Sequence, residues 1–400
     1  MRRAQCFAMA ALVALLGSSA CSAREDGPAP VSRGEIVATT PIAQMSAQDV
    51  TDYLTKGGID TPVRNGVESY RVVYRTIAPD GAATTASGLV VLPRTDSRHL
   101  RVVSYEHGTL AQKNAAPSVD GVHHPDQART IMFAAVGYAA VAPDYLGLGE
   151  GPGTHPYTHA PSEASAGVDL LRAARTFTGQ RQRELDNAVL VTGFSQGGHA
   201  ATALAKALQS GADPGFGLAA LAPISGPYDV QHVETPAGLD GRVGGGSAVY
   251  YFAYWVTAMN RIYHLYDKPS EAFQEPYAEK VEGLFDGLHD DAAIVTQLPA
   301  QPNQLLTQRF MDLALNPTGQ VLKAMTESDG TCDWTPRVPV RLYAATGDRN
   351  VPYANAEHCL QALHSDNATL TNLGDTDHNG SVRAALPGIL AWFQQALPAT

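Results

Sequence analysis

Short apolar runs alternate with amphipathic stretches between residues 69 and 224. Two β-rich runs, residues 69–77 and 84–92, flank the turn signal Pro79-Asp80-Gly81, which predicts an antiparallel hairpin. Apolar strands are then predicted at residues 100–105, 138–142, 188–192 and 218–224, and helices at residues 125–136, 162–177 and 201–208. Strands that alternate with helices predict an α/β fold, in which helices cover both faces of a mostly parallel sheet.

The alternation stops at residue 226 and resumes after residue 335. Helices are predicted between these points at residues 248–266, 269–284, 290–298 and 304–315, and the first of them is rich in aromatic residues. Strands at 338–344 and 368–373 and helices at 353–363 and 382–397 complete the pattern. We therefore expect one α/β core, residues 46–225 and 336–400, with a helical insertion, residues 226–335, after the sixth predicted strand.

The N-terminus has the pattern of a signal peptide. Two arginines precede a short apolar run at residues 7–17, and small residues follow. The run is too short for a permanent transmembrane helix, so we expect residues 1–20 to be removed on export. Residues 21–45 are rich in Pro, Ser and Ala without periodicity, which predicts a flexible tether.

Cys21 is a candidate for lipidation. The Ser-Ala-Cys that ends at this residue resembles a bacterial lipobox, which would tether the exported protein to a membrane. Ser18 stands where that motif usually has Leu. Ordinary cleavage near residues 20–23, followed by free secretion, is the alternative.

Composition narrows the function classes. The chain has 400 residues, of which 44% are hydrophobic and 17% charged, and its net charge is −11. These values describe a globular, core-forming chain. An acidic chain without basic clusters argues against a nucleic-acid partner or an anionic membrane surface.

Two cysteines remain beyond the signal and processing regions, Cys332 and Cys359. A single leftover pair in an exported protein most simply forms one disulfide. Two buried free thiols are the alternative.

Residues 189–200 carry the strongest chemical motif, Val-Leu-Val-Thr-Gly-Phe-Ser-Gln-Gly-Gly-His-Ala. A predicted strand precedes Gly193 and a predicted helix follows Gly197, so the G-x-S-x-G between them fits a nucleophile elbow with Ser195 at its apex. Side chains at the two glycines would collide with neighbouring backbone. A Gly-Ser turn without chemistry is the alternative.

A serine nucleophile needs a base and an acid that orients it, and in α/β-hydrolases the chain order is Ser, acid, His. Asp348 follows a predicted strand, and His378 lies in the loop between the last strand and the last helix. Both positions suit the carboxyl edge of an open sheet. A surface turn is the alternative role for Asp348, whereas His358 is interpreted as a local packing residue and His199 as a structural residue.

An oxyanion hole requires two donors. The backbone N–H of Gln196, directly after the nucleophile, supplies the first, and the second is expected from the loop at residues 107–110. We favour the N–H of Thr109 over those of Gly108 and Leu110.

Three further groups of residues are weighed as site candidates. Asp144 and Tyr145 end a core strand and either line the site or fix the loop beside the elbow; Tyr251 and Trp255 either bind substrate or pack in the core. The remaining group, His123, His124 and Asp126, is too weak a pattern to predict a metal.

Four segments together resemble the secretory lipase family, of the fungal lipase A type with bacterial relatives. They are residues 102–109, 141–149, 155–157 and 193–199. The resemblance spans about residues 60–395 and implies an α/β-hydrolase core, a Ser-Asp-His triad, a helical lid and ester hydrolysis without a cofactor. The fungal members have an acidic residue near the position of Thr109, so substrate preference is not carried over.

The sequence therefore predicts an exported serine hydrolase that cleaves carboxylic esters, with a lipid or small-molecule ester as substrate. A serine peptidase of the same fold is one alternative, and it would need a pocket that anchors a peptide terminus. A non-catalytic surface-binding lipoprotein is another; a complete triad in the required order argues against it.

Overall fold

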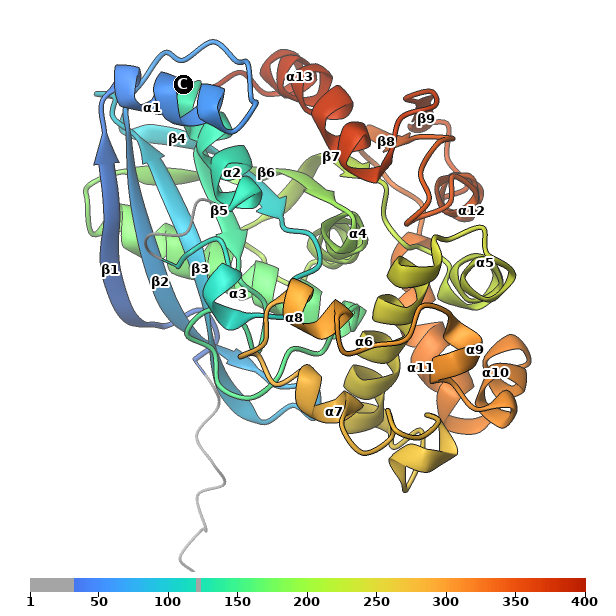
Figure 1. The fold of residues 1–400 in the computed structure, drawn as a ribbon. Helices are drawn as coiled ribbons and strands as arrows, with labels where there is room; N and C mark the ends of the chain where they lie inside the picture. Colours follow the sequence, from blue (N-terminus) through green and yellow to red (C-terminus); the bar gives the residue numbers. More distant parts are fainter. Residues whose placement is uncertain (1–31, 120–123) are drawn as a thin grey trace, which may run out of the picture. The chain divides into compact units, whose positions relative to one another are not determined.

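The computed structural model describes residues 32–119 and 124–400. The predicted signal peptide, Cys21 and most of the predicted tether lie outside the described residues. A nine-stranded sheet forms the centre of the described part (Figure 1). Its strands are β1 (Ile36–Met45), β2 (Val67–Ile77), β3 (Ala83–Pro93), β4 (His99–Glu106), β5 (Ala139–Pro143), β6 (Glu184–Phe194), β7 (Gly217–Ile224), β8 (Val340–Ala344) and β9 (Ala368–Asn372).

The sheet order is β1-β2-β3-β5-β4-β6-β7-β8-β9. The predicted hairpin is confirmed: β2 and β3 pair in antiparallel fashion, as do β1 with β2 and β3 with β5. From β5 to β9 every pairing is parallel. The carboxyl ends of β4, β6, β7 and β8 therefore share one edge, where open α/β sheets place their sites.

Strand β1 occupies a stretch that the sequence pattern assigned to the tether. Eight backbone positions from Ile36 to Met45 pair with β2, although most of its side chains are exposed or half-buried. Pro41 lies at a register irregularity, where an edge strand tolerates a missing N–H. Backbone pairing holds this strand in place, and such pairing leaves no hydrophobic pattern in the sequence.

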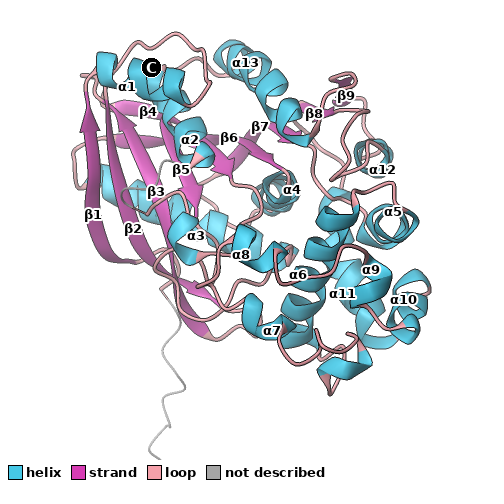
Figure 2. Cartoon of the chain, viewed as in Figure 1, coloured by secondary structure: helices cyan, strands magenta, loops and turns pink. Residues whose placement is uncertain are grey.

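Helices cover both faces of the sheet (Figure 2). On one face α3 (Ala160–Gly179), α4 (Gln196–Gln209) and α12 (Ala354–Ala362) bury apolar side chains against the strands. On the other face α1 (Ala47–Lys56), α2 (Pro125–Ala135) and α13 (His378–Ala396) do the same. Two apolar cores, one on each face, thus hold the sheet in place.

The segment between β7 and β8 is helical and has an apolar core of its own. It comprises η2 (Val230–Glu234), α5 (Thr235–Asp240), α6 (Gly245–Tyr263), η3 (Pro269–Glu271), α7 (Val281–Leu284), α8 (Asp291–Val295), α9 (Pro302–Leu305), α10 (Gln308–Leu315), α11 (Gly319–Asp329) and η4 (Gly330–Cys332). The long aromatic helix was predicted within a few residues. The next two predicted helices are much shorter than expected, and α11 was not predicted. We call this segment the insertion.

Cys332, at the end of the insertion, forms a disulfide with Cys359 of α12, as the sequence predicted. Both residues are fully buried. The bond ties the exit of the insertion to the helix that follows the loop of Asp348. Within residues 32–119 and 124–400, no helix combines the length and the apolar character needed to cross a bilayer.

Candidate active site

Ser195 lies at the sharp turn between β6 and α4. Its backbone has φ 60° and ψ −123°, a region that non-glycine residues rarely adopt and that costs on the order of 1–3 kcal/mol. Its N–H donates to the carbonyl of Ile224 on β7 (3.0 Å), and its carbonyl accepts from the N–H of Gly198 (2.8 Å). The turn is therefore held from the sheet on one side and from the helix on the other.

The two glycines of the motif leave room for this turn. A Cβ at Gly193 would lie 2.1 Å from the carbonyl oxygen of Gly197, and a Cβ at Gly197 would lie 2.0 Å from that of Glu106. Backbone cannot yield to such contacts as a flexible side chain can. The close approach of β4 to the elbow thus requires glycine at both positions.

Glu106 is fully buried beneath the elbow at the end of β4. Burial raises the pKa of its carboxyl to about 8, although the hydrogen bond from Ser104 opposes the shift. The Ser104 hydroxyl donates to Oε1 (2.7 Å), while Oε2 has no partner among the described residues. The raised pKa favours the protonated, uncharged acid at neutral pH.

Asp348 and His378 are joined by a hydrogen bond. Asp348 follows β8, and His378 is the first residue of α13, capped by Asp377. The imidazole Nδ1–H donates to Asp348 Oδ2 (2.6 Å). The other carboxylate oxygen accepts from the backbone N–H groups of Asn350 (2.8 Å) and Val351 (3.0 Å). The carboxylate is fixed, and it fixes the tautomer of the imidazole with Nδ1 protonated.

The imidazole of His378 lies against the residue that precedes Ser195. The rings of Phe194 and His378 have centroids 4.6 Å apart. His378 Nε2 is buried and makes no hydrogen bond within the described part of the chain. The ring of His378 therefore lies beside the elbow, with Nε2 unengaged by the described residues.

The loop after β4 lies beside Ser195. A Cβ at Gly108 would be 3.7 Å from that of Ser195. The N–H of Gly108 donates to Asp126 Oδ2 (3.3 Å), so it is already engaged. The hydroxyl of Thr109 shares a 3.1 Å hydrogen bond with that of Tyr157, which holds the loop to the segment before α3.

A buried ion pair orients the first residue of α4. His199 Nδ1–H donates to Glu163 Oε2 (2.7 Å), and His199 Nε2–H donates to the carbonyl of Ser328 (2.8 Å). Because both partners only accept, His199 carries both ring protons. Burial disfavours both charges, yet each ion favours the other, so the pKa of Glu163 is lowered and that of His199 is raised. The Gln196 amide donates to Glu163 Oε1 (2.7 Å) and is thereby anchored.

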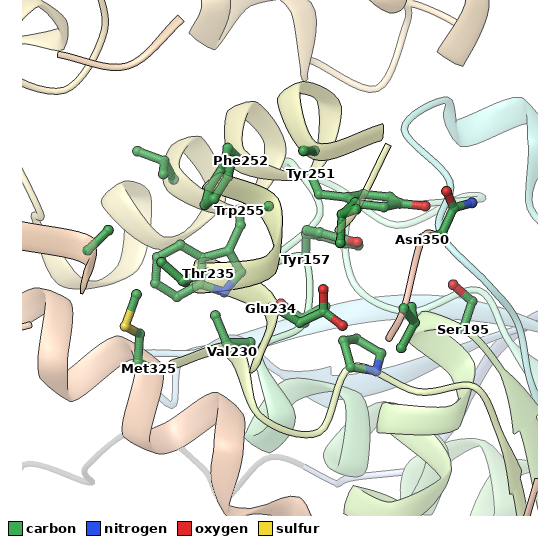
Figure 3. A pocket seen from close by; sticks show the side chains of 18 of the residues that line it. Tyr157, Ser195, Val230, Glu234, Thr235, Tyr251, Phe252, Trp255, Met325 and Asn350 are labelled. Atoms are coloured by element: carbon green, nitrogen blue, oxygen red, sulfur yellow. The ribbon is translucent and has the colours of Figure 1, made fainter. Parts of the chain in front are cut away.

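A cavity opens from Ser195 into the insertion (Figure 3). It holds about 720 Å³ of space between atoms, including the part open to solvent. Tyr251 and Trp255 of α6, both weighed as substrate-lining residues, border it, together with Tyr157, Phe252 and Met325. Most of the wall is apolar, which suits a hydrocarbon part of a ligand.

Asp144 and Tyr145 do not border this cavity. Asp144 is fully buried, and its oxygens accept from the Ser87 hydroxyl (2.6 Å), from the Ser118 N–H (3.0 Å) and from the Ser118 hydroxyl. The Tyr145 hydroxyl donates to the carbonyl of His107 (3.2 Å). Both residues connect loops around the site.

His124 and Asp126 are described, whereas His123 lies outside the described residues. The carboxylate of Asp126 accepts hydrogen bonds from the guanidinium of Arg129 (2.6 Å), the hydroxyl of Tyr105 (2.7 Å) and the N–H of Gly108. Among the residues that the structure describes, no group of three or more His, Cys, Asp or Glu side chains is arranged to hold a metal ion.

Sequence reasoning missed several residues that shape the site. Glu163, Glu234 and Asn355 were not singled out, because lone polar residues on helices carry no motif. One feature of the sequence could have pointed to Glu163. It is a carboxylate in the amphipathic helix predicted at residues 162–177, whose apolar face was expected to be buried. Its partner His199 was expected to be structural, as the hydrogen bonds of its ring indicate.

A mostly parallel sheet, a strained serine between strand and helix, and a carboxylate–imidazole pair at the same edge define the α/β-hydrolase class. Within this class the chain belongs to the secretory lipase family, whose family model matches residues 126–398. No curated protein matches the chain in sequence.

Solved structures agree with this assignment. A putative hydrolase from Legionella pneumophila is 27% identical, with a TM-score of 0.83 over 90% of this chain and 98% of that chain. The rice cell wall degrading esterase LipA from Xanthomonas oryzae is 26% identical, with a TM-score of 0.78 over 91% and 98%. Candida antarctica lipase A in its closed state is 16% identical, with a TM-score of 0.68 over 92% and 82%, and shares the fold.

Proposed function

We propose that this chain hydrolyses carboxylic esters through an acyl-enzyme formed on Ser195. The observation that carries the proposal is the 2.6 Å hydrogen bond between His378 and Asp348, with the opposite ring nitrogen unengaged and the ring packed on Phe194. Membership of the secretory lipase family supports the ester substrate.

In the first step Ser195 Oγ attacks the ester carbonyl and its proton passes to His378 Nε2. The imidazolium that forms is stabilised by Asp348, which stays ionised. The carbonyl oxygen becomes an oxyanion. We assign its two donors to the N–H groups of Gln196 and Thr109, since the N–H of Gly108 is engaged by Asp126. Each such donor contributes roughly 3–4 kcal/mol to the transition state.

In the second step the oxyanion re-forms the carbonyl, the ester C–O bond breaks, and the imidazolium gives its proton to the departing alcohol oxygen, which leaves the acyl group on Ser195. Water then attacks the acyl-enzyme, with His378 again accepting the proton, and the carboxylic acid is released as Ser195 recovers its hydrogen. Water is the one co-reactant of the ester in this sequence of steps.

The insertion acts in this proposal as a lid over the core formed by residues 46–225 and 336–400. Its aromatic helix α6 forms one wall of the cavity that starts at Ser195. Opening and closing of such a segment would admit a lipid or bulky ester and then exclude water.

Export is also part of the proposal. The signal-peptide pattern of residues 1–20 and the family description as secretory lipases both support it. Lipidation of Cys21 remains a hypothesis that rests on the lipobox resemblance alone. Mass spectrometry of the mature N-terminus distinguishes a diacylglyceryl cysteine from a free N-terminus.

The function is tested by comparing p-nitrophenyl esters with aminoacyl p-nitroanilides of matched size. We expect rapid ester turnover by the wild type and a loss of at least about a thousandfold in kcat for Ser195→Ala. Faster turnover of the anilides would assign the chain to the peptidases instead. Equal ester turnover by the wild type and Ser195→Ala would refute the proposal.

A further inference from the structure

The cavity that opens from Ser195 has a mostly apolar wall that contains two buried polar atoms without a partner among the described residues, Trp255 Nε1 and Thr158 Oγ1. The carboxyl of Glu234, a half-buried residue of η2, also borders the cavity, and Figure 3 shows Glu234 between the indole ring and Ser195 in this view. Buried polar groups in folded proteins are nearly always hydrogen-bonded. The unpaired indole N–H that faces this cavity therefore indicates a ligand with a polar group.

Trp255 supplies a donor. Its side chain is 7% exposed, and its Nε1–H has no acceptor within the described residues. A buried indole N–H normally finds an acceptor, and leaving it unpaired costs about 1–3 kcal/mol. Because Trp255 lines the cavity, a ligand in that cavity can supply the missing oxygen.

Glu234 supplies a second polar group whose direction is fixed. Asn355 Nδ2–H donates to its Oε1 (2.6 Å). Asn355 is itself held, since its Oδ1 accepts from the N–H of Asp229 (3.0 Å) and its amide also donates to the carbonyl of Pro352 (3.2 Å). No hydrogen bond joins Oε2 of Glu234 to any described residue, and the side chain borders the cavity.

The surroundings of Glu234 fit a ligand without charge. Burial raises the pKa of this carboxyl well above its usual value, against the hydrogen bond from Asn355, and the carboxylates of Asp348, Asp329 and Asp229 add to the rise. The carboxyl can pair with a hydroxyl of the ligand, whereas a carboxylate on the ligand would meet these acidic neighbours.

We propose that Trp255 Nε1 and Glu234 Oε2 form a subsite for a hydroxyl group of the substrate, remote from the scissile ester. The preferred substrate is then an ester whose cavity-bound part is a hydrocarbon chain with a hydroxyl along it. This inference rests on the proposed function for the role of Ser195, but binding to the subsite does not depend on catalysis.

Binding is measured first, by calorimetry on the Ser195→Ala protein, with a medium-chain alkanol and with diols of the same length that carry the second hydroxyl at successive positions. Without the subsite, the added hydroxyl loses its water and weakens binding. With it, we expect one diol to bind about five- to tenfold more tightly than the alkanol. Weaker binding of every diol would overturn the inference.

Variants assign the effect to the two groups. Trp255→Phe keeps an aromatic ring and removes the N–H, and Glu234→Leu removes both oxygens; each should abolish the preference for the diol. Glu234→Gln keeps a donor and an acceptor and should retain it within about threefold. Thr257→Val is the matched control, since this buried residue of α6 does not line the cavity, and its preference should equal that of the parent.

Turnover is measured second, on the wild type. The acyl side is tested with p-nitrophenyl esters of a plain fatty acid and of its hydroxylated analogues. The alcohol side is tested with butyrates of the alkanol and of the diols. A higher kcat/KM for one hydroxylated series identifies the half of the ester that enters the cavity. A diol preference without any ester hydrolysis refutes the function and leaves the subsite standing. Ester hydrolysis with no diol preference refutes the subsite alone.

Discussion

At the scale of single residues, the site depends on donors and acceptors that face the correct way. The carboxylate of Asp348 accepts two backbone N–H groups on Oδ1 and the His378 N–H on Oδ2. In all three hydrogen bonds an oxygen of Asp348 is the acceptor and an N–H group is the donor. This arrangement leaves the lone pair of His378 on Nε2, where the proposed reaction needs it.

Replacing Asp348 with Asn tests this arrangement. The backbone donors of Asn350 and Val351 will hold the amide oxygen and turn its NH₂ toward His378, so that Nδ1 becomes an acceptor and Nε2 carries the hydrogen. We expect kcat for p-nitrophenyl butyrate to fall by about 10³–10⁴-fold, with KM little changed. A fall of less than tenfold in a variant with a normal circular dichroism spectrum would contradict the assigned roles.

Glu106 gives the protein a pH-dependent stability. Its pKa is raised to about 8 in the fold, whereas an unfolded chain releases this proton near pH 4–5. Between these pH values the unfolded state holds fewer protons than the native state. The contribution of Glu106 to the free energy of unfolding therefore falls by about 1.4 kcal/mol for each unit by which the pH rises.

Glu106→Gln removes that dependence. Measured by urea unfolding at pH 5.5 and pH 7.5, the stability lost by the wild type over this range should exceed that lost by the variant by roughly 2–3 kcal/mol. The same loss in both proteins would mean that Glu106 is ionised in the fold.

At the scale of elements, patterns in the sequence predict the segments whose side chains are buried. They miss segments that are held in place by backbone hydrogen bonds. The parallel strands and the elbow follow from apolar runs and glycine spacing. The edge strand β1 does not, because its exposed side chains carry no pattern and its pairing with β2 is made by main-chain groups. Two short helices of the insertion were merged for a similar reason: the cap Thr307 divides a stretch, residues 304–315, that looks continuous by hydrophobicity.

The disulfide joins two elements whose positions matter to the site. Cys332 and Cys359 are 27 residues apart in the sequence, and closing a loop of this size in the unfolded chain is worth about 3–4 kcal/mol. Replacing both with Ala should lower Tm by several degrees in scanning calorimetry, with ester turnover at low temperature nearly unchanged. Reduction of the wild type by dithiothreitol serves as the control. An unchanged Tm in both experiments would show that the bond adds no stability.

At the scale of the whole molecule, the chain combines a sheet edge that presents Ser195 with an insertion that shapes the approach to it. The sequence predicted that Asp348 and His378 lie at the same edge of the sheet, where the structure joins them by a hydrogen bond, since the strand ends of a parallel sheet converge. That Glu234 and Trp255 border one cavity could not be predicted in the same way. Their placement depends on how the insertion packs, and no periodic pattern encodes that packing.

The central claim is that Ser195 is the nucleophile, and covalent labelling tests it most directly. The protein is treated with a fluorophosphonate, digested and mapped by mass spectrometry, alongside Ser195→Ala and the control Ser247→Ala, whose serine borders a neighbouring hollow with Thr109. We predict one equivalent of label, on the peptide that contains Ser195, in the wild type and the control, and none in Ser195→Ala. Label on another residue, or undiminished labelling of Ser195→Ala, would contradict the claim.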